Sequence, residues 1–335
     1  MKILFAFLYD VGIFFYRAGI QIASLRNSKA KQWIAGRKNL FQKIPSQLNL
    51  NEYRVWFHCA SVGEFEQGRP VIEAYRKKFP SHKIVLTFFS PSGFELRKNY
   101  SGADYIFYLP LDTKRNASRF ISLVDPKLTV FVKYEFWFRF LSEINRREIP
   151  AIMISAIFRE NHLLFNSFFK PLKNVVMSIR KIFVQDENSV RFLQQNNFMN
   201  AELAGDTRFD RVWQIAQSPG KLPIIEQFKA DKKLFVAGST WLADEKLLFQ
   251  LIAATDDSWR WIIVPHEIET SHISELKKNY SEVILYSELE NGRPAGHKKI
   301  LVVDKIGFLS SIYQHAHLAY IGGGFGKGIH SLLEA

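Results

Sequence analysis

Two acidic side chains directly follow short apolar stretches of the sequence, at positions where a carboxylate could do chemistry. Glu64 comes after the segment 60–63, and Glu135 lies between Lys133 and two aromatic residues. A carboxylate within reach of a hydroxyl group can remove its proton as a general base. Glu64 is expected near a helix start, which stabilises its anion, so it would be a weak base unless it is desolvated or lies beside another acid. A carboxylate between aromatic walls needs a positive partner, for which Lys133 is the nearest candidate, and such a place also suits carbohydrate. The structural alternatives are a helix cap at Glu64 and a local ion pair at Glu135.

Small residues occupy two of the predicted loops that follow strands. Ser61 and Gly63 stand just before Glu64, and the glycine permits a tight turn there. Ser90 and Ser92 follow another apolar stretch, and their hydroxyl groups could hydrogen-bond a sugar. Serines in this place also commonly cap the next helix, and the pattern does not separate the two interpretations.

A glycine-rich segment near the end of the chain has the composition of an anion site. Its members include Gly323, Gly324, Gly326, Lys327 and His330. Backbone N–H groups in such a turn, at the start of a helix expected near His330, can bind a phosphate, and Lys327 or His330 would add positive charge. The segment lacks the order of a Walker loop, and a flexible glycine turn is the alternative.

Two further loops indicate a nucleotide site in the same half of the chain. Ser239 and Thr240 close an apolar stretch and could open a helix, which would place two hydroxyl groups and free amides together. His266 follows another apolar stretch in the same way, although a single histidine is often structural. The sequence has no Asp-x-Asp pattern and no histidine-rich site, so we expect neither a metal nor a cofactor.

The elements that carry these loops alternate between short apolar strands and helical stretches. We expect strands at residues 54–59, 83–89, 104–108, 128–132, 151–157 and 181–185, and then at 234–237, 261–264, 283–286, 300–303 and 318–321. Apolar runs separated by helices are typical of parallel strands that are covered on both faces. Ligands of open α/β sheets bind at the carboxyl ends of strands, so the loops above should lie there. The sequence therefore predicts an α/β protein with two Rossmann-like domains.

Length and composition fit two such domains. The chain has 335 residues, of which 47% are hydrophobic and 23% are charged, and this composition excludes a disordered protein. Its single cysteine, Cys59, excludes an internal disulfide and suits a reducing compartment. The formal net charge of +13 favours an anionic partner such as nucleic acid, phospholipid or a phosphorylated substrate.

The first residues predict a helix at a membrane surface. Residues 3–25 are mostly apolar, and the polar members of the segment fall on one narrow stripe at about 100° per residue. Asp10 and Arg17 interrupt the run that a spanning helix needs, so a shallow anchor is favoured over a span, a buried helix or a cleaved signal peptide. Six basic residues and no acid lie between residues 26 and 43, which favours the cytoplasmic face and anionic lipid, with a solvated linker as the alternative.

Five segments occur in an order that resembles the 3-deoxy-D-manno-octulosonic acid (Kdo) transferases. They are Ser61-Val62-Gly63-Glu64, Ser90-Pro91-Ser92-Gly93, Glu135-Phe136-Trp137, Gly205-Asp206-Thr207-Arg208-Phe209-Asp210 and the glycine-rich segment continued through Glu334. Each motif is weak alone, but five in register form a specific signal. The resemblance implies a GT-B glycosyltransferase whose two Rossmann-like domains face one another across a cleft. Because the chain stops at Ala335, we expect the second domain to be incomplete.

The same resemblance implies the reaction and its partners. Kdo would pass, with inversion, from a CMP-Kdo donor to a phosphorylated lipid A precursor during lipopolysaccharide biosynthesis. The protein would be held on the anionic cytoplasmic face of the bacterial inner membrane, and no nucleic acid would take part. Glu64 would be the general base, and Glu135 a second acid in the acceptor cleft. The donor would be contacted by Lys327, His330 and Glu334 at CMP and by Ser239 and Thr240 near the phosphate.

These features divide the chain into three parts. A membrane-associated helix and basic arm would occupy residues 1–45, an acceptor-binding domain 46–208, and a partial CMP-sugar-binding domain 209–335. A nucleotide-linked oxidoreductase is one alternative, but it would need a glycine-rich turn after the first strand, where this chain has a single glycine. A non-catalytic protein that binds lipid or nucleic acid is the other alternative, and only the net charge supports it.

Overall fold

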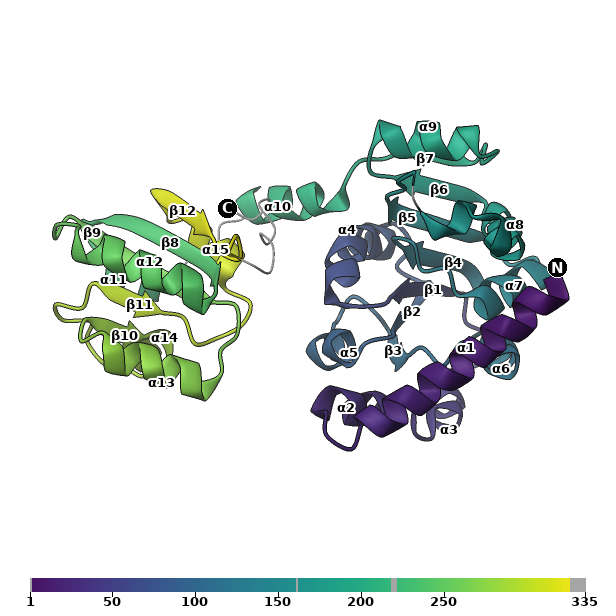
Figure 1. Cartoon of the computed structure of the whole chain (residues 1–335), viewed down its shortest axis with the longest axis horizontal. Coiled ribbons are helices and arrows are strands. Elements are labelled where there is room, and N and C mark those ends of the chain that lie inside the picture. Colours follow the sequence, from purple (N-terminus) through teal and green to yellow (C-terminus); the bar gives the residue numbers. More distant parts are fainter. Residues whose placement is uncertain (1, 161, 218–221, 326–335) are drawn as a thin grey trace. The chain divides into compact units, whose positions relative to one another are not determined.

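The computed structural model describes residues 2–160, 162–217 and 222–325, and the chain forms two compact units (Figure 1). The first unit contains Met1–Arg211 and the second Val212–Ala335. Each unit is built on its own parallel β-sheet with helices packed on it. The predicted α/β class with two Rossmann-like domains is therefore confirmed.

The sheet of the first unit has seven strands in the order β3-β2-β1-β4-β5-β6-β7, and all neighbours are parallel. The strands are β1 (Arg54–Cys59), β2 (Lys83–Phe88), β3 (Tyr105–Tyr108), β4 (Pro126–Val132), β5 (Ala151–Ala156), β6 (Lys181–Val184) and β7 (Ala201–Leu203). Every residue of β1 is buried, which explains its almost uninterrupted apolar run. The sequence pattern predicts the first six strands but not β7, because this edge strand has three partly or fully exposed residues and no apolar run.

Helices cover both faces of this sheet. α4 (Val62–Lys78) and α5 (Pro91–Arg97) pack on one face, where Phe65 and Ile72 contact the cluster around Phe57. A larger cluster around Phe120 and Phe140 holds the helices of the other face. These helices are α6 (Lys114–Val124), α7 (Phe138–Arg146), α8 (Lys170–Met177) and α9 (Glu187–Gln195), with short 3-10 turns at Leu163–Phe165 and Ser167–Phe169.

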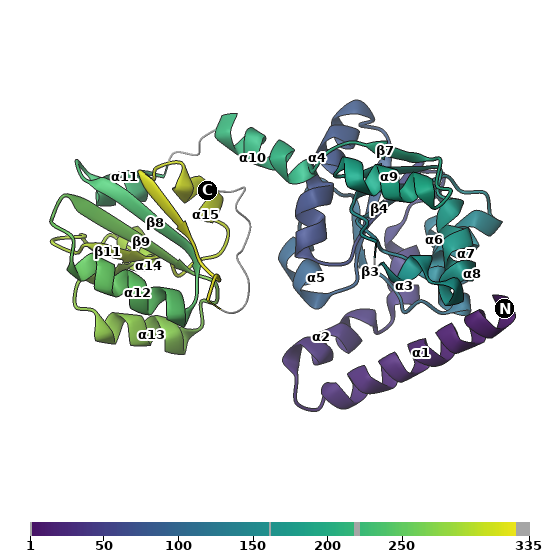
Figure 2. The ribbon, with the colours of Figure 1, turned by 45° about the horizontal axis from the view of Figure 1, so that its top comes forward.

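Three further helices precede the sheet, and they pack onto the first unit. They are α1 (Lys2–Ala23), α2 (Ser28–Arg37) and α3 (Leu40–Gln47). Figures 1 and 2 both show α1 running along one side of the unit beside α2. Phe5 of α1 is buried in the larger core cluster, and its ring meets the edge of Phe138 at 5.1 Å. One face of α1 is therefore part of the fold.

The segment expected to be a basic arm is helical, and one of its cations points inward. The Arg37 guanidinium donates to the backbone oxygens of Leu109 (2.9 Å), Phe89 (2.7 Å) and Trp33 (3.1 Å). It also lies 3.7 Å from the centre of the buried Trp33 ring. The alternative that this residue belongs to a solvated linker is wrong, because carbonyl oxygens and aromatic faces surround its guanidinium.

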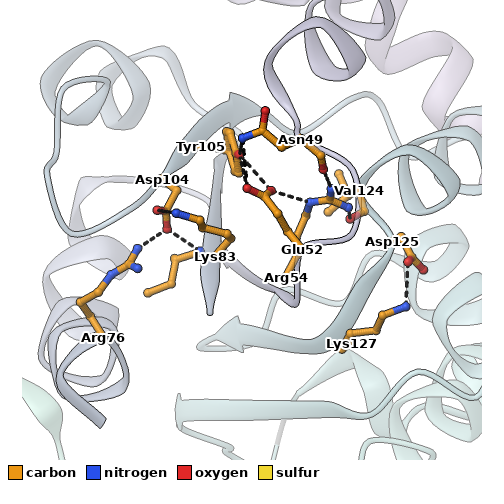
Figure 3. A network of polar contacts seen from close by, with 11 residues as sticks. Asn49, Glu52, Arg54, Arg76, Lys83, Asp104, Tyr105, Val124, Asp125 and Lys127 are labelled. Atoms are coloured by element: carbon orange, nitrogen blue, oxygen red, sulfur yellow. Dashed lines mark hydrogen bonds and ion pairs between the residues drawn. The ribbon is translucent and has the colours of Figure 1, made fainter. Parts of the chain in front are cut away.

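The amino ends of the central strands are tied together by a network of polar contacts (Figure 3). Arg54 at the start of β1 donates to Glu52 (3.3 Å) and to the backbone oxygen of Val124 (3.1 Å). Asp104 accepts the backbone N–H of Ile84 (2.8 Å), and it also pairs with Arg76. Burial acts to raise the pKa of Asp104, but its hydrogen bonds and nearby positive charges outweigh this effect and lower the pKa. These contacts connect the amino ends of β1 and β2 to the segments that lead into β3 and β4.

The second unit has a five-stranded parallel sheet in the order β10-β11-β9-β8-β12. Its strands are β8 (Lys233–Thr240), β9 (Trp259–Pro265), β10 (Val283–Leu285), β11 (Ile300–Val302) and β12 (Leu318–Ile321). Its helices are α11 (Pro223–Lys229), α12 (Leu242–Ala253), α13 (Thr270–Asn279), α14 (Tyr286–Glu290) and α15 (Leu309–Tyr313), and α10 (Thr207–Gln217) begins in the first unit and crosses the division of the chain. Two apolar clusters, one containing Ile262 and the other Ile263, pack against the sheet.

Candidate active site

Three loops meet at the carboxyl edge of the first sheet, where the sequence predicted a site. The backbone N–H groups of Phe89 and Ser90, after β2, both donate to the carbonyl oxygen of Ala60 after β1 (3.2 and 2.8 Å). The Phe89 ring lies 4.5 Å from that of Trp137, which follows β4. Backbone hydrogen bonds and ring packing thus bring together the loops that follow β1, β2 and β4.

Glu64 lies in the first turn of α4 and is held there by the residue before the helix. Its Oε2 accepts the Ser61 backbone N–H at 2.6 Å and also the Ser61 hydroxyl. This is the reciprocal contact of a capping box, so the structural role anticipated for Glu64 is present. Its Oε1 has no hydrogen-bond partner in the described part of the chain. One oxygen therefore fixes the carboxylate while the other can accept a proton.

Gly63 does not form the tight turn expected from the sequence. It lies within α4, and it is absent from the described glycines with positive φ. A Cβ built on it would come no closer than 3.8 Å to the Ser61 oxygen. Since an alanine would fit without strain, the glycine at this position is not required by the backbone.

Glu135 contacts a histidine rather than the lysine expected from the sequence. Its Oε2 lies 3.7 Å from Nε2 of His58, a fully buried residue of β1. Lys133 makes no ion pair with it among the described residues. The Lys133 backbone takes the left-handed conformation (φ 64°) and its N–H donates to Ile154. The predicted Lys133–Glu135 pair is wrong, because the turn after β4 brings Glu135 over the end of β1.

The hydrogen bonds of His58 fix its tautomer. Trp137 Nε1 can only donate, and it donates to His58 Nε2 at 3.1 Å. The ring proton of His58 must then sit on Nδ1, which lies 2.9 Å from Thr87 Oγ1. The same hydroxyl accepts Trp56 Nε1 at 2.8 Å. A buried chain of hydrogen bonds thus runs from the centre of the sheet to the loop that carries Glu135.

The thiol between these acids is not a nucleophile. Burial, and then the carboxylates of Glu64, Glu135 and Glu66, raise the pKa of the Cys59 thiol well above its usual value. A protonated, fully buried thiol is unreactive.

The serines of the second loop mainly shape the backbone. Ser90 Oγ accepts the Gly93 N–H at 3.2 Å and caps α5, and it lies 2.9 Å from Ser92 Oγ. Ser92 is exposed. The capping interpretation thus describes Ser90, while the exposed Ser92 hydroxyl is open to further hydrogen bonds.

The second unit has a cavity of about 530 Å³ at the carboxyl ends of β8 and β9. Asp244 forms part of its wall, and this buried carboxylate accepts the backbone N–H groups of Trp241 (2.8 Å) and Gly323 (3.0 Å). Tyr320 donates to its other oxygen at 2.7 Å. Asp244 thereby ties the start of α12 to the beginning of the glycine-rich segment.

The beginning of that segment requires glycine. Gly323 has φ 98°, in the left-handed region. A Cβ on Gly322 would lie 2.4 Å from the backbone oxygen of Ser239. Gly324 is also described, whereas Gly326, Lys327, His330 and Glu334 lie outside the described residues.

The hydroxyl groups expected to open a helix belong to the end of β8. The strand continues through Thr240, and α12 begins at Leu242 after Trp241. The Thr240 hydroxyl donates to buried Glu245 at 2.9 Å, and the other oxygen of Glu245 lies 2.7 Å from His272 Nε2. Ser239 has φ 52° at an irregularity of the sheet. The expected helix opening is wrong, because pairing with β9 extends the strand past Gly238 to Thr240.

His266 lies beside the same cavity. Its ring stacks on that of Trp241 with 4.6 Å between the centres, and its N–H donates to the Thr240 carbonyl oxygen. The cavity wall also contains Glu267, Glu269 and Glu275. These carboxylates suit hydroxyl groups of a ligand better than an anion.

Several residues of both sites were not indicated by the motifs. His58 and Thr87 sit inside apolar strands, where the sequence does not tell which polar side chains have partners. Asp244 and Glu245 are adjacent acids at a helix start just after a strand, and this signal could have identified them.

The two sheets identify the structural class. The chain is similar to UDP-GlcNAc 2-epimerase from Neisseria meningitidis, solved with UDP-GlcNAc, at a TM-score of 0.54 and 13% identity over 79% of this chain and 76% of that one. A putative UDP-N-acetylglucosamine 2-epimerase from Listeria monocytogenes gives a TM-score of 0.54 at 11% identity over 80% of this chain and 73% of that one. The protein thus has a GT-B-type α/β fold with two Rossmann-like domains.

The sequence identifies the family within this class. Residues 29–211 match the family described as 3-deoxy-D-manno-octulosonic-acid transferase (kdotransferase), and the chain belongs to this family of glycosyltransferases. The 3-deoxy-D-manno-octulosonic acid transferase of Chlamydia trachomatis is 29% identical over 84% of this chain, and that of Aquifex aeolicus is 27% identical over 84%. A bifunctional glycosyltransferase/methyltransferase from Fusobacterium nucleatum is 28% identical over 86%. The chain spans 46% of the Fusobacterium protein, 67% of the Chlamydia protein and 72% of the Aquifex protein.

Proposed function

We propose that this protein transfers Kdo from CMP-Kdo to a phosphorylated lipid A precursor in lipopolysaccharide biosynthesis. The observation that carries the proposal is the hydrogen bonding of the Glu64 carboxylate. Within the segment that matches the family, its carboxylate is oriented through Oε2 and has Oε1 open for a proton. Homologues named as Kdo transferases supply the substrate class.

The proposed reaction is a direct displacement with inversion. Glu64 Oε1 takes the proton of the acceptor hydroxyl as the oxygen attacks the anomeric carbon of Kdo. The bond from that carbon to the CMP phosphate oxygen breaks, and its electron pair leaves with CMP. Glu135 stands at the same sheet edge on a loop held by His58, where it orients hydroxyl groups of the acceptor.

The donor half of the site is proposed in the second unit. The cavity beside Asp244 would receive the nucleoside, whose ribose hydroxyl groups can donate to the carboxylates of the wall. The backbone at Gly323 allows close approach of a ligand to the glycine-rich segment. Contacts from Lys327, His330 and Glu334 to CMP remain predictions from the family resemblance.

We further propose that α1 holds the protein on the anionic cytoplasmic face of the inner membrane. By length and composition α1 could cross a membrane. However, one face of it packs on the first unit, where Arg139 pairs with Asp10 and Tyr9 donates to Asp112 at 2.5 Å. The opposite face exposes Phe7, Phe14 and other large apolar side chains. A helix attached along its length with its outer face apolar is suited to lie in the membrane surface.

The proposal is tested by the substitution Glu64→Gln. The amide oxygen can still accept from Ser61, so the fold should persist, but no proton can be taken from the acceptor. We expect turnover, measured as CMP release and as mass gain of the lipid, to fall by about 10²- to 10⁴-fold. The matched control is Glu66→Gln on the same helix, whose carboxylate pairs with Arg97 instead. Near-normal turnover of the Glu64 variant would remove this residue from the role of base.

A further inference from the structure

A cavity of about 560 Å³ in the first unit has cationic and apolar walls, and Arg37 in its wall also donates to Phe89 of the loop after β2. It is enclosed by α1, α2, α3 and the segment that leads into α6. Arg17, Arg37, Lys38 and Arg115 line it, together with apolar side chains such as Trp33 and Leu111. The described lining contains no carboxylate. Its electrostatic character therefore favours an anionic ligand that also has an apolar part.

One of these cations provides a fixed positive charge. Arg37 uses its guanidinium on three carbonyl oxygens and on the Trp33 ring, and none of the described carboxylates pairs with it. Burial lowers the pKa of Arg37 to about 9, which still leaves the group charged at neutral pH. A partly buried charge without a counter-ion is costly, and an anion bound nearby would offset part of that cost.

The other three cations are exposed and unpaired among the described residues. Arg17, Lys38 and Arg115 surround the cavity and make no hydrogen bond or ion pair to the described part of the chain. Other arginines of the same unit do find carboxylates: Arg97 pairs with Glu66, and Arg147 with Glu143. Three like charges around one hollow repel one another, so their arrangement is stabilised by an anion between them.

The indole of Trp33 contributes a mostly buried aromatic ring to this wall. Trp33 is 8% exposed, and its Nε1 is buried with no hydrogen-bond partner among the described residues. Most buried donors have an acceptor, and an unpaired one carries a desolvation cost.

The position of the cavity along α1 indicates which anion it meets. At about 100° per residue, Arg17 falls on the flank of α1 between the packed face at Phe5 and the exposed face at Phe14 and Ile22. A helix in the membrane surface buries its apolar face about 5–10 Å into the boundary between headgroups and acyl chains. Residues on its flank then lie at the level of the lipid phosphates.

We propose that this cavity binds the phosphate headgroup of an anionic glycerophospholipid, with the apolar wall in contact with the glycerol and the first acyl carbons. This inference rests on the attachment of α1 to the membrane in the proposed function. The protein would then bind single lipid molecules at a specific site, in addition to the general attraction between its net positive charge and the membrane.

The test measures binding of dihexanoyl phosphatidylglycerol, used below its micelle concentration, to the whole chain by calorimetry. The triple variant Arg17→Gln, Lys38→Gln, Arg115→Gln is compared with the control triple Arg26→Gln, Lys29→Gln, Lys31→Gln, which removes the same charge from exposed positions nearby. We expect the cavity triple to bind roughly 10- to 100-fold more weakly and the control to change by less than about threefold.

Several results would overturn the proposal. Equal losses in the two triples would mean diffuse attraction only, and equal binding of dihexanoyl phosphatidylcholine would exclude recognition of the anion. Equal binding of inorganic phosphate would remove the lipid from the proposal, and binding of the lipid A precursor but not of phosphatidylglycerol would assign the cavity to the acceptor.

Transfer assays in phospholipid-free detergent micelles keep the two proposals distinguishable. An inactive chain that binds the phospholipid would contradict the proposed function alone, and an active chain that does not would contradict this inference alone.

Discussion

At the scale of single residues, other side chains fix the positions of the two candidate acids, Glu64 and Glu135. Glu64 gives one oxygen to Ser61, and the loop of Glu135 is tied to His58 by the Trp137 indole. The motifs indicated both acids as candidates, because each follows a strand, and their role in the reaction stays a prediction. They did not predict His58, since a histidine inside a buried strand has the same sequence pattern whether it is a partner of a site or a core residue.

We predict that His58 acts as a positioning residue for the loop 133–137. His58→Ala should leave Trp137 Nε1 without an acceptor and let the loop shift, lowering kcat by about 10- to 100-fold while KM for the donor stays unchanged. His58→Gln can offer an oxygen near the place of Nε2 and should recover part of kcat. Kinetics of the two variants check this, with Thr87→Val as the control that removes only the hydroxyl on the Nδ1 side. If both His58 variants lose the same activity, the role is merely structural.

At the scale of elements, α1 shows how one helix can be both a part of the core and a surface for a membrane. The polar stripe predicted from the sequence exists, and one of its members, Asp10, pairs with Arg139 of α7. Phe5 and Tyr9 complete the inner face. Periodicity revealed the stripe, but it could not show which neighbour would satisfy it, because that depends on contacts between residues far apart in the chain.

We predict that the outer face of α1 is needed for membrane binding but not for folding. Phe7, Phe14 and Phe15 are 63%, 66% and 66% exposed, so replacing all three with serine removes apolar area only from the surface. Co-sedimentation with vesicles should fall by roughly 100-fold or more, since burial of each side chain contributes about 1.5–3 kcal/mol. The matched control replaces three exposed apolar residues outside α1 with serine: Leu50, Met199 and Phe209. Unchanged sedimentation of the α1 variant would contradict the anchor.

The contact between α1 and α7 should also make stability depend on pH. Asp112 is fully buried and accepts Tyr9, the Arg139 N–H and the Phe140 N–H; burial raises its pKa from 3.8 to about 6 in spite of these bonds. Between these two values the folded chain keeps a proton that the unfolded chain releases. The free energy of unfolding gained from this group is therefore complete below pH 4 and is lost as the pH rises through 6.

The measurement is urea unfolding from pH 4 to pH 7 for the natural chain and for Asp112→Asn. The variant cannot titrate at this position, so the difference between the two free energies of unfolding should fall by about 3 kcal/mol across this range. Changes in hydrogen bonding add an offset that does not vary with pH and cancels in the slope. A flat difference would show that Asp112 does not titrate in this range.

At the scale of the whole molecule, the chain has two sets of apolar clusters that share no residue. The clusters around Phe120 and Phe57 belong to Met1–Arg211, and those around Ile262 and Ile263 to Val212–Ala335. Most of this organisation could be predicted, because parallel strands covered on both faces leave long apolar runs in the sequence. The lengths of β8 and β7 could not, since pairing with neighbouring strands, and not apolar content, sets where these two strands begin and end.

Because each of the two units has its own apolar core, we predict that the two units unfold separately. Phe120 and Ile262 are each 0% exposed, and truncating either to alanine should cost its own core about 2–5 kcal/mol. In differential scanning calorimetry we expect two transitions, of which Phe120→Ala lowers one by several degrees and Ile262→Ala the other. Adding phosphatidylglycerol should then raise only the transition that Phe120→Ala lowers, because the proposed lipid cavity lies wholly within that unit. One transition moved equally by both substitutions would mean that the two units unfold as one, and the division of the chain near residue 211 would have no thermodynamic meaning.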